Sequence, residues 1–236
     1  MKKLICGFMV AMSITFVPMQ ASAGFLGDLA GDFAGNLLVD GLEHSARKNA
    51  DKILVALWKS AVLMEESKLC IAEALELNPR EIAASKEALR AMTLDHKDMK
   101  AIRKSIRHEL PESELQSKTA KLMTITDQAK LDQLSKLLKR SKDARSAAHS
   151  YNSDAIGHIL STIGHIAVLH ELDPAAEDRI MGYFLSRIMD SRELLDYQKQ
   201  QSKMFHQTFD IVERKMNIKE PSKKEIKKIE KELLPQ

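Results

Sequence analysis

Hydrophobic residues recur every three or four positions along most of the chain, which is the spacing of one face of an α-helix. Glycine is absent from the 115 residues between Gly41 and Gly157, and only Pro79 and Pro111 interrupt that span. Because glycine and proline punctuate turns, their scarcity favours long uninterrupted helices. The pattern therefore predicts an all-α fold.

Capping signals mark where several helices begin. Asn78 and Asp173 each precede a proline, which suits the first helical position because its missing N–H has no partner there. Ser222 and Glu225 have the spacing of a capping box. We also expect a break at Asn152-Ser153-Asp154. The predicted helices cover residues 25–46, 50–77, 79–92, 95–109, 112–151, 154–172, 174–216 and 223–234.

The helix predicted over 174–216 has apolar residues at alternating steps of three and four, a coiled-coil-like seam with Ser191, Gln198 and Ser202 in its middle. Short turns between helices favour antiparallel neighbours. We expect an elongated antiparallel helical bundle with coiled-coil-like long helices. The seam consists of Met181, Phe184, Ile188, Ser191, Leu195, Gln198, Ser202, Phe205, Phe209, Val212 and Met216.

The first residues are typical of a secretory signal peptide: Lys2 and Lys3, an apolar run from Leu4 to Val17, and small residues ending at Ala23. We expect cleavage near Ala23 and a periplasmic or secreted protein. This divides the chain into a signal peptide (1–23), a glycine-rich amphipathic N-terminal arm (24–46), a helical bundle (47–216) and a charged C-terminal helical tail (217–236).

Composition narrows the classes of partner. Removing Lys2 and Lys3 lowers the formal net charge from +3 to +1, so no strong field attracts polyanions. The aromatic residues are not interleaved with basic runs, which argues against a nucleic-acid partner. One cysteine, Cys70, remains after cleavage. We expect it to be a buried inert thiol, with intermolecular pairing as the alternative.

The arm contains GFLGDLAGDFAGN, with glycines every four residues and apolar side chains on one helical face. We expect this face to contact the chain's own bundle, a second copy or another protein, with a membrane surface as the alternative. The segment resembles the glycine- and phenylalanine-rich fusion peptides of enveloped viruses, which implies membrane insertion. The candidate contact residues are Phe25, Leu26, Gly27, Leu29, Gly31, Phe33 and Gly35.

The tetrapeptide IGHI occurs twice, seven residues apart, between Ile156 and Ile166. Asp154, His158 and His165 fall on one helical face, which makes them candidate metal ligands or a pH-sensitive contact. A metal site needs three or four ligands, so we favour hydrogen-bonded core histidines in a central helix. We expect the glycines of the repeat, Gly157 and Gly164, to permit close helix packing.

Basic residues cluster over 97–107 and 136–145, typically as solvated helix faces and alternatively as docking sites for acidic partners or lipid headgroups. No nucleophile elbow, zinc-protease helix, phosphate loop, paired cysteines or dinucleotide fingerprint occurs in the sequence. We therefore expect no enzymatic activity and no cofactor. The sequence favours an exported protein that acts through protein contacts or self-association. The alternatives are a membrane-active protein, of the pore-forming or fusogenic kind, and a bundle that binds a metal or small ligand.

Overall fold

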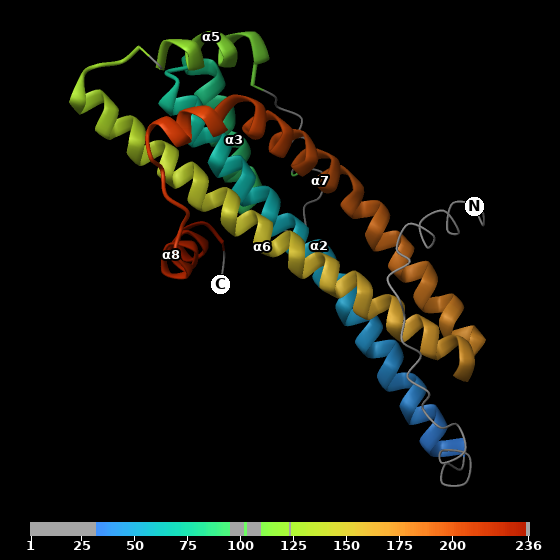
Figure 1. Cartoon of the computed structure of the whole chain (residues 1–236). Coiled ribbons are helices and arrows are strands. Elements are labelled where there is room, and N and C mark those ends of the chain that lie inside the picture. The colour runs from blue at the N-terminus through green and yellow to red at the C-terminus, as the bar shows by residue number, and fades with distance from the viewer. Residues whose placement is uncertain (1–31, 95–101, 103–109, 123, 235–236) are drawn as a thin grey trace. The chain divides into compact units, whose positions relative to one another are not determined.

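The computed structural model describes residues 32–94, 102, 110–122 and 124–234, and in these ranges it contains helices and no strand (Figure 1). The predicted all-α fold is confirmed for this part of the chain. The helices are α2 (Asp32–Ala74), α3 (Pro79–Leu94), α5 (Glu112–Leu122), α6 (Gln128–Leu172), α7 (Pro174–Lys215) and α8 (Lys223–Leu233). The chain divides into two compact units, Met1–Gly41 and Leu42–Gln236, and the contacts below belong to the second.

Three predicted helix starts are confirmed by their caps. The side chain of Asp173 accepts hydrogen bonds from the backbone N–H groups of Ala175 and Ala176, and Pro174 opens α7. Asn78 accepts from the N–H of Arg80 at 3.0 Å at the start of α3. Ser222 and Glu225 form the predicted capping box of α8. Each cap satisfies N–H groups that have no partner within the helix.

The predicted breaks near residues 47–49 and 152–154 are wrong. Helix α2 is continuous from Asp32 to Ala74, and α6 continues through Asn152-Ser153-Asp154. Ser153 points its hydroxyl back along α6 and donates to the carbonyl of His149 at 3.1 Å, so it does not cap a new helix. The break lies earlier, where Asp127 accepts from the N–H groups of Ala129 and Lys130 and starts α6. The helix predicted over 95–109 lies outside the described residues apart from 102.

From Leu42 onward, α2, α6 and α7 run along one another (Figure 1). Helices α2 and α6 are antiparallel, since contacts pair Asn49 with Ser161, Ser60 with Ala148 and Ser67 with Ser141. Helices α2 and α7 are parallel, since Glu43 contacts Arg179 and Glu65 contacts Tyr197. Helix α6 also packs against α7 and α8, and α5 packs against α7.

The interior of this array contains a polar group between α2 and α7. Glu65 and Lys68 are fully buried and form an ion pair of 2.7 Å, and the hydroxyl of Tyr197 donates to Glu65 at 2.5 Å. Burial and the neighbouring Glu65 carboxylate raise the pKa of Tyr197, so its proton stays in this hydrogen bond. Removing one partner of such a buried ion pair strongly destabilises the fold, because the other charge stays buried without compensation.

The seam predicted on α7 is buried at Phe205, Phe209 and Val212 and also at its polar members Ser191 and Gln198. Ser191 donates to the carbonyl of Arg187 at 2.7 Å, and Gln198 donates to the carbonyl of Leu57 at 3.0 Å. These bonds give the Ser191 hydroxyl and the Gln198 amide N–H partners in the interior. Leu195 is 41% exposed, so the seam is not covered at every position.

Candidate interaction surface

Helix α6 presents an uncharged face to solvent over its second half. Between Ala155 and Leu169 the helix contains no Asp, Glu, Lys or Arg. At 100° per residue, one sector about 120° wide contains six residues that we call the uncharged face. All six are exposed or half-buried: Gly157, Leu160, Ser161, Gly164, Ala167 and Val168.

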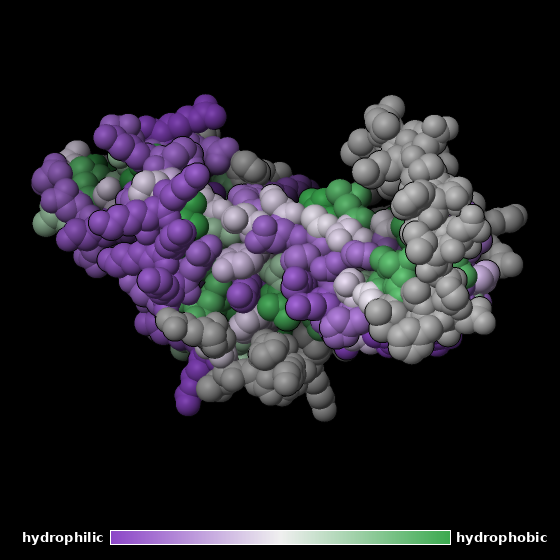
Figure 2. All heavy atoms as spheres, turned by 90° about the horizontal axis from the view of Figure 1, so that it is seen from below, coloured by the Kyte–Doolittle hydropathy of each residue, from purple (hydrophilic) through white to green (hydrophobic). Residues whose placement is uncertain are grey.

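Large apolar side chains lie in this face and along its edges. The exposed fractions are 51% for Ile156, 46% for Leu160, 47% for Val168 and 48% for Leu172. On α7, Leu185, Met189 and Leu195 are exposed as well. Figure 2 shows green apolar patches on a surface that is otherwise largely purple. Single exposed apolar residues are ordinary, whereas apolar residues that continue along one helix mark an interaction site.

The two glycines of the repeated IGHI sequence face open space. A Cβ atom added at Gly157 or Gly164 would meet no atom within 4 Å outside the helix's own turns. The expectation that these glycines allow close packing is therefore not met within the described part of the chain. A helix-interior glycine costs about 0.5–1 kcal/mol relative to alanine, and no internal contact of these two explains that loss.

A hollow of about 260 Å³ lies between α2, α6 and α7, and none of the six residues of the uncharged face lines it. Leu57 of α2, Ile156 and Ile159 of α6, and Leu195 and Gln198 of α7 all contribute to its lining. Ile156 of α6 and Leu195 of α7 both line this hollow, so it separates apolar side chains of the two helices.

The histidines of the repeat are at the border of the interior, and the expectation of core histidines is wrong. Asp154 is exposed, whereas His158 and His165 are half-buried. Burial and the nearby ammonium of Lys52 lower the pKa of His158, and Asp154 opposes them. The Nδ1 atom of His165 is buried and has no hydrogen-bond partner among the residues that the structure describes. Among the described residues, no group of three or more His, Cys, Asp or Glu side chains is placed to hold a metal.

Most candidate residues of the N-terminal arm lie outside the described part of the chain. These are Phe25, Leu26, Gly27, Leu29 and Gly31. Phe33 and Gly35 are in the first two turns of α2. The contact role of the arm stays a prediction.

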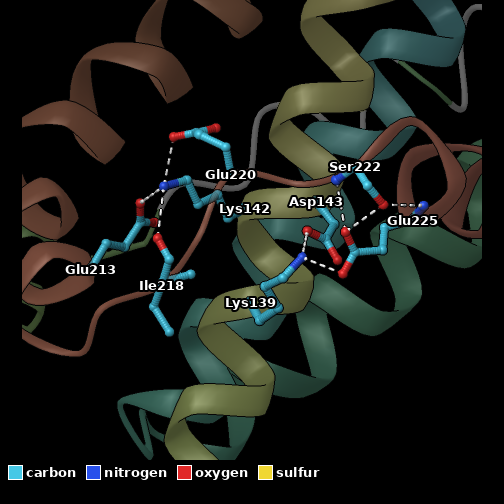
Figure 3. Close-up of polar contacts among 8 residues, drawn as sticks. All are labelled: Lys139, Lys142, Asp143, Glu213, Ile218, Glu220, Ser222 and Glu225. Carbon is cyan, nitrogen blue, oxygen red and sulfur yellow. Dashed lines mark hydrogen bonds and ion pairs between the residues drawn. The ribbon is translucent and has the colours of Figure 1, made fainter.

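The basic cluster in the first half of α6 is largely used within the chain (Figure 3). Lys139 lies between Asp143 and Glu225, at 3.1 Å from the latter. Lys142 contacts Glu220 at 2.7 Å and donates to the carbonyl of Ile218 at 3.1 Å. These ion pairs hold α8 and the segment before it against α6, so neither lysine is a bare solvated cation.

Arg140 and Arg145 continue this pattern. Arg140 bridges Glu66 of α2, at 2.5 Å, and Glu232 of α8, at 2.8 Å. The guanidinium of Arg145 pairs with Glu213 of α7 and lies 5.1 Å from the centre of the Phe205 ring. Burial raises the pKa of Glu213, and the neighbouring Arg145 and Lys142 oppose that shift.

A polar cleft of about 560 Å³ opens between α6 and the end of α7. Its lining combines three cations with three carboxylates: Lys142, Arg145 and Arg214 with Asp210, Glu213 and Glu220. Cations and carboxylates balance one another there, so the cleft does not select a ligand of one charge. Its ionic groups serve mainly to join α6, α7 and the segment before α8.

Cys70 is almost fully buried, with its thiol 3.8 Å from a carboxylate oxygen of Glu66. Burial and the Glu66 charge raise the pKa of the thiol far above its usual range. A thiol that stays protonated and inaccessible neither attacks nor pairs readily. The structure thus favours the inert thiol over the intermolecular disulfide.

Sequence reasoning missed the exposed sector of α6 because it treated this apolar helix as central. A usable signal was present: Gly157, Ser161 and Gly164 share one sector, and small weak helix formers are unusual choices for a bundle centre.

No protein family, no curated protein and no solved structure matches this chain.

Proposed function

We propose that the chain is an exported, non-enzymatic helical protein that acts through protein contacts, with the uncharged face of α6 as its contact surface. The observation that carries this proposal is the exposure of Leu160 and Val168 beside two glycines with open space above them. The proposed setting is the periplasm or the cell exterior, in an envelope or secretion assembly.

Apolar side chains that face water can still contribute burial energy to an assembly. Fully burying a Val or Leu side chain stabilises an assembly by about 1.5–3 kcal/mol. The exposed side chains of the uncharged face would gain part of this on meeting an apolar partner, whereas the paired cations of the first half of α6 would gain little.

The proposed scaffold is an elongated antiparallel bundle with coiled-coil-like long helices. The opposite directions of α2 and α6, given by their contacts, support the antiparallel part of this description. A rigid helix is well suited to hold Leu160 and Val168 in fixed positions, since sites on helices are more precise than sites on loops.

The test is cross-linking of the mature chain, residues 24–236, in envelope extracts of the cells that produce it. We expect cross-linked partner bands that Leu160→Lys removes, because a lysine in the apolar contact must lose its hydration. Gln133→Lys is the matched control: Gln133 is exposed on α6, and 27 residues place it about 40 Å from Leu160. Bands that persist unchanged in Leu160→Lys would contradict the proposal.

One observation favours a membrane-active protein as the second candidate. Among the described residues, α6 alone is long and apolar enough to cross a membrane by length and composition, and only 22% of its apolar window is buried in the fold. This candidate predicts that the mature chain releases dye from liposomes and that Leu160→Lys reduces the release. No release at neutral or acidic pH would eliminate it.

A further inference from the structure

We propose that the occupant of the uncharged face is a second copy of this chain, packed antiparallel to the first about a twofold axis between Leu160 and Ser161. This inference rests on the proposed contact function and names the partner at that surface. It follows from the exposed apolar side chains, the order of small and large residues along the face, and the distribution of charge around it.

The order of residues is self-complementary. With a twofold axis between positions 160 and 161, Gly157 of one copy lies opposite Gly164 of the other, and the same pair forms again on the far side of the axis. Leu160 and Ser161 lie next to their own counterparts, and Val168 lies opposite Ser153. The two facing glycine pairs let the backbones approach closely on either side of the axis, where the two copies of Leu160 lie side by side.

The heptad distance between the glycines serves the same geometry. Gly157 and Gly164 are seven residues apart, so both return to one seam when two helices wrap around each other. Among the described residues, no other helix brings an atom within 4 Å of a Cβ built at either glycine. A second helix on this seam would explain why two weak helix formers occupy the middle of a long helix.

The absence of charge favours an identical copy. In a twofold interface each residue near the axis meets its own counterpart, so a charge there would face a like charge. From Ala155 to Leu169 the sequence has none. The carboxylates nearest this range on each side are Asp154, which would lie opposite Ala167 of the partner, and Glu171, which would lie opposite the exposed Ser150, so neither would face a like charge.

The surroundings argue against a bilayer as the occupant. The end of the α6–α7 hairpin contains Glu171, Asp173, Glu177 and Asp178, and Arg179 is the next fixed cation along the sequence. Helices that lie on membranes usually have lysines and arginines flanking their apolar face, which meet anionic lipids. An acidic hairpin end would be repelled from such lipids at neutral pH.

The size of the face sets the expected strength. A helix contact over residues 153–172 is about 30 Å long. Such a two-helix contact buries less than the roughly 800 Å² per partner of a standard interface. We therefore expect a weak dimer, with a dissociation constant on the order of micromolar, that dissociates on dilution.

The first test is sedimentation of purified residues 24–236 across a concentration series. We expect a monomer–dimer equilibrium whose dissociation constant rises at least about tenfold in Leu160→Arg and in Gly164→Leu. Gly164→Leu has room to fold within its own chain, since nothing lies near that position, and blocks only the approach of a second backbone. Circular dichroism checks that each variant keeps its helices, and Gln133→Arg is the matched control.

The second test fixes the register with single cysteines. Ser161→Cys should form a disulfide-linked dimer under mild oxidation, because position 161 lies next to the axis. Val168→Cys should not, because its two copies would be about 22 Å apart along the antiparallel helices. The buried Cys70 gives the background, which the parent chain measures. Equal cross-linking of both variants would indicate parallel helices and overturn the proposed packing.

Three other outcomes also overturn the inference. A chain that stays monomeric at all concentrations excludes the second copy; if Leu160→Lys still removes partner bands from extracts, the proposed contact function stands with a different partner. Loss of the dimer on deletion of residues 24–31 would make the N-terminal arm the occupant. Flotation of the parent chain with anionic liposomes, abolished by Leu160→Arg, would make a membrane the occupant.

Discussion

The two halves of α6 meet opposite conditions on one continuous helix. In the first half, Lys139, Arg140 and Lys142 each reach carboxylates on other helices or on the segment before α8. In the second half, from Ala155 to Leu169, no charged residue is present and Leu160 and Val168 face solvent. The first half completes its contacts within the chain, and the second leaves apolar surface without a partner among the described residues.

This difference separates surfaces that stabilise the fold from surfaces available for binding. An ion pair already formed within the chain gives little to a partner, because the partner's charge would only replace an existing one. Exposed apolar surface still has its burial energy to contribute. The second half of α6 is therefore the better candidate for a binding surface, even though the first half is richer in polar groups.

The largest effect is expected from the buried ion pair of Glu65 and Lys68 on α2. This pair lies level with the first half of α6, since the neighbouring Ser67 contacts Ser141. Lys68→Met leaves the Glu65 carboxylate buried without its 2.7 Å ammonium partner and should lower the free energy of unfolding by about 3–5 kcal/mol. Lys52→Met, at an exposed lysine of α2 beside the second half, should change it by less than about 0.5 kcal/mol. Urea denaturation measures both. Equal effects would show that the interior polar group does not depend on this pair.

The same truncation on the two halves of α6 should give unequal losses. Leu138 is fully buried, so Leu138→Ala should destabilise the chain by about 2–5 kcal/mol through lost burial and a cavity. Leu160 is 46% exposed, so Leu160→Ala should cost only about 0.5–1 kcal/mol. Thermal and urea unfolding at concentrations where the chain is monomeric give the comparison. Similar losses would mean that the second half is covered in solution.

The contact between α8 and the first half of α6 should weaken in acid. Hydrogen bonds from the backbone and side chain of Ser222, and then Lys139, lower the pKa of Glu225 from 4.5 to about 2. Because the folded value lies below the unfolded one, this carboxylate stabilises the docked helix above pH 4.5 and loses that contribution as pH falls towards 2. A carboxyl NMR titration should show the low value, and Ser222→Ala and Lys139→Met should each move it upward, because each removes a hydrogen bond to this carboxylate. A Glu225 that titrates near 4.5 would contradict the capped, ion-paired arrangement.

Local signals predicted much of the fold. The caps at Asn78, Asp173 and Ser222 act within a few residues, so their sequence spacing is sufficient to find them. The break expected at Asn152-Ser153-Asp154 failed because these residues also occur within helices, where Ser153 donates to the carbonyl four residues back. Whether such residues end a helix or continue it depends on their neighbours in space, which the sequence does not give.

The candidate surface was harder to predict for a related reason. An apolar helix with histidines and glycines fits a bundle centre as well as an exposed face, and periodicity alone does not separate the two. The basic cluster of α6 shows the converse: its spacing indicates an outer face, yet Arg140 bridges Glu66 and Glu232 from distant parts of the chain. Long-range pairs of this kind are invisible to spacing.

The smallest change in stability should come from replacing a glycine in the second half of α6, and the sign of that change is informative. Gly164→Ala adds a methyl group into open space and removes backbone freedom from the unfolded chain, so the monomer should gain about 0.5–1 kcal/mol of stability. Ala148→Gly, at a fully buried alanine of the first half, should lose at least that amount. A glycine whose replacement stabilises its own chain serves something other than the fold. Differential scanning calorimetry can resolve the shift, and a destabilised Gly164→Ala monomer would show that this position is packed after all.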